Sequence, residues 1–195
     1  MYKRLYTLML ALSLCTLGFA GCQRSGSNVQ AAREPEVPAS KSPAATNTIS
    51  GADKDFVLQA EKDSIQERVL GRMAQEQSQN DAVKDYGKML VKDHSDALKK
   101  LVDLMNKNGM AQPKGLPEER SEAVKKLQGL SGPAFDKEFL NMMVTNHQKA
   151  INEFRHQAAT AQNADVRDYA KSVLPTLEKH LKDAEDLQSK LGNKG

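Results

Sequence analysis

The segment VKDHSDALKKLV, residues 91–102, combines an amphipathic helical pattern with a polar side chain in its apolar stripe. When the pattern is extended to a predicted helix over residues 81–108, its inward-facing positions recur every three or four residues. These positions are Val83, Gly87, Leu90, His94, Ala97, Leu101 and Met105. Leu or Ala would be the default at position 94, so the stripe raises the question of why a helix turns His94 toward its core.

Three further segments repeat this periodicity, over residues 53–79, 134–162 and 164–191. They are rich in Ala, Leu, Lys, Glu and Gln, which favour helices. The chain has no Trp, and the Val/Ile/Thr alternation that strands require is scarce. Polar turns near residues 80 and 163 separate the helices within each half of the region.

The connection over residues 109–133 is rich in Pro and Gly, and a short helix is predicted from near Pro117. Asp53 is the expected N-cap of the first long helix and Gly109 the C-cap of the second. Pro175 is expected to kink the last helix or shift its start. Two hairpins joined by a long link predict an all-α fold, a four-helix bundle whose long crossover contains the short helix between the second and third long helices. An extended coiled coil is the alternative, which the Pro- and Gly-rich middle and the short turns disfavour.

The chain begins MYKRLYTLMLALSLCTLGFAGC, which has the layout of a secretory signal peptide. Lys3 and Arg4 precede an uncharged apolar run over residues 5–20, which is shorter than the ~20 residues of a membrane span. An uncleaved anchor helix is the alternative. The stretch FAGC, ending at Cys22, resembles the bacterial lipoprotein cleavage motif, with Phe19 where Leu is commonest. This resemblance implies that Cys22 is acylated and becomes the new N-terminus.

Cys22 is the one cysteine that would remain after cleavage, so it cannot form a disulfide within the mature chain. Acylation with several chains gives stable attachment to a membrane. Gln23 follows the cysteine, and in lipoproteins the absence of Asp there implies export to the outer membrane. The predicted location is therefore the outer membrane, facing the periplasm, or the periplasm itself if Cys22 carries no lipid.

The predicted organisation is a signal peptide over residues 1–22, a tether over 23–52 and a helical bundle over 53–195. The tether is rich in Ser, Ala, Pro, Asn and Thr and has no aromatic residue. A flexible coil of its length reaches about 30 Å. The formal net charge of the chain is +3, and both signs are mixed along every helix. This distribution gives no nucleic-acid-binding footprint, so no nucleic-acid partner is expected.

Glu67, His94, His147 and His180 are predicted to share one level of the bundle. Glu67 lies about 13 residues before the first turn and His94 about 14 after it, and a helix rises 1.5 Å per residue. His147 lies about 16 residues before the second turn and His180 about 17 after it. His180 is placed on the flank of its stripe, in which Leu181 points inward.

One carboxylate and three imidazoles inside a helical bundle have the composition of a metal site for iron, zinc, copper or manganese. Asp63 and Asp93 could support the ligands as hydrogen-bond partners. The alternative is a structural polar layer, in which buried histidines bond to a carboxylate and to each other. His156, the remaining histidine, falls on the polar side of its helix.

Four blocks of the sequence resemble a bacterial ferritin-like family of unknown function, described as predicted outer-membrane proteins or lipoproteins. The blocks are Glu67 with LGRMA after it, VKDYGKMLVKDH, GPAFDKEFLNMMVTNHQKAINEF and VLPTLEKHL. The resemblance implies a ferritin-like four-helix bundle that is exported and often lipid-anchored. It implies no established activity.

Two classes of function follow for such a chain. One is an envelope lipoprotein that presents a helical bundle for binding, for structure or for stress tolerance, attached to the membrane through the lipid on Cys22. The other is a metal-binding protein or metal-dependent oxidoreductase that uses the glutamate and histidine layer. The sequence points to no protein partner, and whether the chain is an enzyme stays open.

Overall fold

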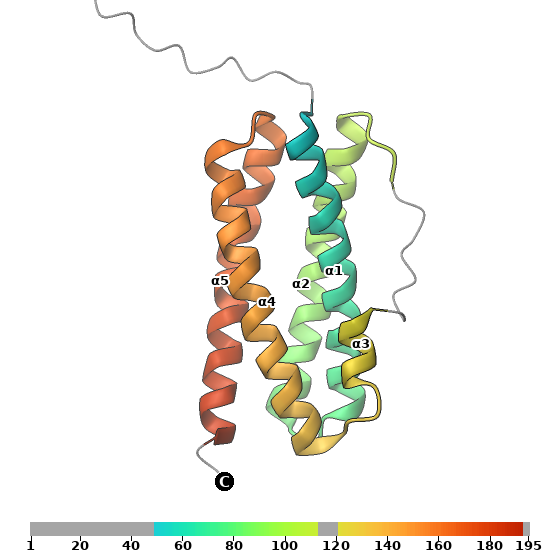
Figure 1. Ribbon diagram of the computed structural model, residues 1–195, viewed down its shortest axis with the longest axis vertical. Helices are drawn as coiled ribbons and strands as arrows, with labels where there is room; N and C mark the ends of the chain where they lie inside the picture. The colour runs from blue at the N-terminus through green and yellow to red at the C-terminus, as the bar shows by residue number, and fades with distance from the viewer. Residues whose placement is uncertain (1–48, 113–120, 193–195) are drawn as a thin grey trace, which may run out of the picture. The chain divides into compact units, whose positions relative to one another are not determined.

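The computed structural model describes residues 49–112 and 121–192. These residues form four long helices and one short helix, joined by turns (Figure 1). The helices are α1 (Gly51–Gln77), α2 (Asp81–Lys107), α3 (Glu122–Leu127), α4 (Gly132–Thr160) and α5 (Ala164–Gly192). These residues contain no strand, so the all-α prediction is confirmed. The predicted signal peptide, Cys22, the tether up to residue 48 and Pro117 lie outside the described residues.

The long helices form two hairpins that pack against each other (Figure 1). Helix α1 packs along α2 and α4 along α5, while α2 also contacts α5 and α1 contacts α4. Asparagines start the second helix of each hairpin, as the turn pattern predicts. The Asn80 side chain accepts from the Ala82 N–H at 3.0 Å, and Asn163 Oδ1 accepts from the Asp165 N–H at 2.9 Å.

The N-cap of α1 differs from the prediction. Ser50 is the cap, and its hydroxyl accepts from the Asp53 N–H at 3.0 Å. Asp53 lies inside the helix, and its carboxylate accepts from the backbone N–H groups of Gln162 and Asn163 at 3.3 and 2.8 Å. The buried carboxylate therefore ties the start of α1 to the turn between α4 and α5.

The structure tests two predictions about local sequence signals, the C-cap at Gly109 and the effect of Pro175 on α5. Gly109, with φ of 65°, follows the end of α2 as predicted. Pro175 lies within α5, which begins at Ala164 and runs on to Gly192. The helix tolerates this proline because Pro175 and Lys171, whose carbonyl loses its helical donor, both lie on the exposed side.

The inward-facing stripes are close to those predicted. Every position of the α2 stripe is buried, His94 included. In α5, however, Leu181 is half-buried and His180 is fully buried. The buried seam of this helix is Val173, Leu177, His180, Ala184 and Leu187, which keeps an alternating spacing of four and three.

The buried apolar residues form two clusters, one toward each end of the long helices. On α2, His94 lies between Leu90 of one cluster and Ala97 of the other. His147 and His180 occupy the same kind of position on α4 and α5, so a polar layer separates the two clusters. None of the described helices is both long enough and apolar enough to cross a bilayer.

Candidate metal centre

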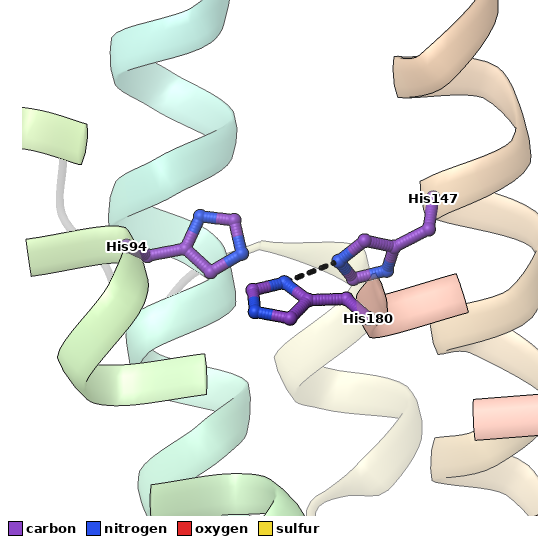
Figure 2. A group of neighbouring side chains, drawn as sticks. All are labelled: His94, His147 and His180. Atoms are coloured by element: carbon purple, nitrogen blue, oxygen red, sulfur yellow. Dashed lines mark hydrogen bonds between the residues drawn. The ribbon is translucent and has the colours of Figure 1, made fainter. Parts of the chain in front are cut away.

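Three histidines from three helices converge in this polar layer. His94 comes from α2, His147 from α4 and His180 from α5, and their rings point toward one another (Figure 2). One ring nitrogen from each lies within 4.8 Å of the other two. The exposed fractions of the residues are 6%, 2% and 0%, respectively. The structure therefore brings together the three histidines that the helix register placed at one level.

The outward-facing nitrogens of two rings are held by accepting oxygens. His147 Nδ1 lies 2.9 Å from the carbonyl oxygen of Met143, one turn earlier in α4. His180 Nε2 lies 3.0 Å from Asp93 Oδ2 on α2. The inward-facing nitrogens, His147 Nε2 and His180 Nδ1, lie 3.2 Å apart (Figure 2). These contacts fix how both rings are oriented.

The positions of the ring hydrogens follow from these partners. A carbonyl oxygen only accepts, so the hydrogen of a neutral His147 lies on Nδ1 and its Nε2 then carries a lone pair. An ionised Asp93 also only accepts, so the hydrogen of a neutral His180 lies on Nε2 and its Nδ1 carries a lone pair. The two lone pairs then face each other, and the buried Nε2 of His94 has no hydrogen-bond partner. A cation among the rings, either a metal ion or a proton, removes this conflict.

The surroundings of His94 and His180 disfavour a proton on either of these two rings. Burial lowers the pKa of His180 to about 4, although its hydrogen bond to Asp93 acts in the opposite direction. Burial, followed by the proximity of His180 and His147, holds the pKa of His94 well below its ordinary value. Both rings are therefore neutral near pH 7, and neutral imidazole is the form that binds metals.

Glu67 lies beside the histidine cluster and is not among the three residues whose ligand atoms converge. It is buried on α1, where its Oε1 accepts from the Asn146 amide at 3.0 Å and its Oε2 has no partner. Burial raises the pKa of the Glu67 carboxyl, while nearby His147 and the Asn146 bond act to lower it. The structure thus supports the predicted depth of Glu67 and places its carboxylate outside the trio.

The two predicted supporting carboxylates have different positions. Asp93 supports the cluster, but it bonds to His180 on another helix and not to its sequence neighbour His94. Asp63 is exposed and accepts from the Gln59 amide at 2.7 Å. Asp93 is therefore the carboxylate that orients a candidate ligand directly.

Two residues that contact the layer were missed by sequence reasoning. Asn146 binds Glu67, and the Tyr86 hydroxyl donates to the backbone carbonyl of His180 at 3.0 Å. Asn146 precedes His147 as Asp93 precedes His94, so the same neighbour rule could have found it. Tyr86 carries no comparable signal, because an inward tyrosine on α2 is also an ordinary core residue.

Comparisons with known proteins give a family and a fold. The family described as a domain of unknown function (DUF4142) matches residues 38–187. No curated protein matches the chain. A crystal structure of a DUF305 fragment from Deinococcus radiodurans is similar at a TM-score of 0.60, with 18% sequence identity over 73% of this chain and 99% of that chain. At this identity the structural similarity bears on the fold alone.

Proposed function

The chain belongs to the DUF4142 family, which has no established activity, and we propose that it is an exported, lipid-anchored protein that binds a transition metal ion. The ligands are His94, His147 and His180, in the core of a ferritin-like four-helix bundle with a long crossover. The observation that carries the proposal is the convergence of three buried imidazole nitrogens within 4.8 Å. Zinc and copper suit such a set of imidazole nitrogen ligands.

The partners of the rings support metal binding. Histidines that bind metals usually donate their second N–H to a carboxylate or a backbone carbonyl, which leaves the other nitrogen free for the ion. Asp93 fills this role for His180, and the Met143 carbonyl fills it for His147. At a metal–nitrogen distance of ~2.1 Å, the His147 and His180 nitrogens, 3.2 Å apart, subtend an angle of about 100° at the ion, which lies near tetrahedral geometry. His94, whose nitrogen lies within 4.8 Å of both, binds the same ion only at a separation below about 4.2 Å from each of them.

A purely structural polar layer is the competing function, in which the His147–His180 contact would be a hydrogen bond. That layer needs an extra proton to make this contact a hydrogen bond while Asp93 stays ionised. It also leaves His94 Nε2 buried without a partner. A metal ion bound by all three rings would give each of these nitrogens a partner, and this supports metal binding over the structural layer.

The ferritin-like description rests on two helical hairpins, the segment with α3 that joins them, and a polar layer at mid-height between two apolar clusters. Carboxylate di-iron bundles draw most of their ligands from glutamates. In this chain Glu67 is the glutamate beside the cluster, and its carboxylate does not converge with the histidine nitrogens. A single ion on three histidines therefore fits these residues better than a di-iron centre.

Export and lipid attachment are proposed from the sequence that ends at Cys22. Metabolic labelling with a radioactive fatty acid should label the full-length protein and not its Cys22→Ala variant. The outer membrane is the expected location, since Gln23 follows the cysteine. Equal labelling of both proteins, or recovery of the wild type in the cytoplasm, would contradict the proposed anchoring.

Metal binding is tested on the full mature chain, purified without a histidine tag and stripped with a chelator. We expect about one zinc or copper ion per chain after reloading and gel filtration, measured by mass spectrometry. His94→Ala and His147→Ala should each lose the ion, while the exposed control His156→Ala should keep it. Circular dichroism verifies that each variant is folded. A wild-type protein that binds no ion, or variants that bind as well as wild type, would support the structural layer.

A further inference from the structure

A pocket between α1 and α4 runs from the protein surface to the histidine cluster. Its volume is about 210 Å³. Its inner wall includes the buried residues Glu67, His94 and His147, and its outer wall includes the exposed Asp63 and Lys149. The pocket is thus the feature that connects the candidate ligands with the solvent on this side of the protein.

We propose that this α1–α4 pocket is the route by which a divalent cation reaches the three histidines, and that Glu67 receives the cation beneath the mouth. The inference rests on the proposed metal-binding function and adds a path and a further binding residue to it. Its two supports are the free oxygen of Glu67 and the charge of the pocket wall.

Glu67 is a buried carboxylate with an unused oxygen. It is 5% exposed, and although Oε1 accepts from Asn146, Oε2 has no partner. Buried polar atoms in folded proteins nearly always have partners, so an unpartnered oxygen in a pocket wall is suited to hold an ion or a water molecule. Carboxylate oxygens are ordinary ligands of divalent metals.

The charge of the pocket wall suits a cation. Carboxylates line it at three depths: Asp63 is exposed, Glu153 is half-buried and Glu67 is buried. Lys149 is the cationic residue of the same wall and interacts electrostatically with Asp63. Its positive charge opposes the attraction of these carboxylates for an ion. The cavity exceeds the ~30 Å³ that one water occupies in the liquid, so it has room for an ion that keeps part of its water shell.

A second depression, on the side of α2 and α5, is the rival route. It is lined by Asp93, Asp96 and Asp103 together with lysines, and it includes none of the three histidines. Asp93 Oδ2 is already bonded to His180. An ion on this side would meet a supporting residue before any ligand, whereas the α1–α4 pocket leads directly to two ligands.

The test measures how fast Co²⁺ alone binds to the metal-free full chain, by stopped-flow absorbance at low salt. Asp63→Asn should slow association roughly two- to fivefold and Lys149→Gln should accelerate it by a similar factor, because surface charge steers an ion into a cleft. Both effects should shrink in high salt. Asp103→Asn, the matched control in the rival depression, should leave the rate unchanged.

Two variants examine the inner part of the route. Ala150→Leu places a larger side chain in the pocket wall and should slow association and dissociation together, with the equilibrium affinity changed by less than about threefold. Glu67→Gln should slow association at least roughly tenfold if the carboxylate receives the ion. The surface variants keep the test valid even if Ala150→Leu fails to fold.

The outcomes separate the route from the site. If Co²⁺ binds to wild type but Asp63→Asn and Lys149→Gln leave the rate unchanged, or Asp103→Asn slows it, the α1–α4 route is wrong and the metal site stands. If wild type binds no Co²⁺, both the site and the route are wrong. Opposite rate changes in the two α1–α4 variants, with no change in Asp103→Asn, support the route.

Discussion

Replacing His94 with leucine should make the metal-free protein more stable while abolishing metal binding. His94 is 6% exposed in the α2 stripe between Leu90 and Ala97, and its Nε2 is buried without a hydrogen-bond partner. Leucine has a similar volume and continues the apolar stripe. The substitution therefore removes an unsatisfied polar atom at a position where the packing already suits an apolar side chain.

The size of the effect follows from the site of His94. A buried polar atom without a partner costs about 1–3 kcal/mol. The higher helix propensity of leucine adds at most about 0.7 kcal/mol, and imperfect packing of its branched end offsets about 1 kcal/mol. The expected gain in the free energy of unfolding is therefore up to about 2.7 kcal/mol, with a middle value of about 1.4 kcal/mol. For a domain of this size the middle value corresponds to a rise in Tm of about 3–6 °C.

Urea unfolding in the presence of a chelator, followed by circular dichroism, measures this gain. The matched control is His156→Leu, an exposed position where the change should stay within about 0.5 kcal/mol. Metal at about one hundred times its Kd should then stabilise wild type by about 2.7 kcal/mol and the His94→Leu variant not at all. A His94→Leu protein that is less stable than wild type by 1 kcal/mol or more would refute the reasoning, since His94 would then make a satisfied structural contact.

Three further predictions concern pH, packing and ligand support. The stability advantage of His94→Leu over wild type should grow as pH falls below about 6.5, by at most about 1.4 kcal/mol per pH unit. Burial keeps the pKa of His94 low in the folded protein, so only the unfolded chain takes up the proton in this range. Urea midpoints measured across pH check this, and a difference that stays constant with pH contradicts it. Gly87→Ala should destabilise the protein by about 1–3 kcal/mol in thermal unfolding, because the new Cβ would lie 2.6 Å from the Gly71 carbonyl oxygen. An unchanged Tm would argue against this close approach of the two helices. Asp93→Asn should weaken metal affinity about 10–100-fold in chelator competition, because His180 loses its carboxylate, and an equal Kd would show that this bond is dispensable.

The helices were predictable because their periodicity is long and regular, and the four long ones begin and end within two residues of the prediction. The N-cap of α1 shows where local rules stop. Ser50 and Asp53 are both good caps by residue type. Asp53 is committed to the backbone N–H groups at Gln162 and Asn163, a contact between distant parts of the chain that no local pattern reveals.

The height of the site was predictable, and the direction of its side chains was less so. Counting residues from a turn gives depth, because every helix rises by the same amount per residue. It does not say which way a side chain points around the helix axis, and an error of one residue rotates that direction by about 100°. For this reason the pattern predicts Leu181 as the inward residue where the structure has His180. It also predicts Glu67 as a ligand, whereas the structure has Glu67 beside the three histidines.

The donor set also determines how strongly the site discriminates against metals that prefer oxygen ligands, so the difference in affinity between Zn²⁺ and Mn²⁺ tests the site. Three buried imidazoles converge, and the carboxylates of Asp93 and Glu67 lie outside the converging group. Imidazole nitrogens favour Cu²⁺ and Zn²⁺, whereas Mn²⁺ and Mg²⁺ prefer oxygen ligands. In competition titrations we therefore expect Cu²⁺ to bind more tightly than Zn²⁺ and Zn²⁺ far more tightly than Mn²⁺. Mn²⁺ binding as tight as that of Zn²⁺ would contradict a histidine-only site. If the Glu67→Gln variant then lost this tight Mn²⁺ binding, the Glu67 carboxylate would be shown to turn inward and become a ligand.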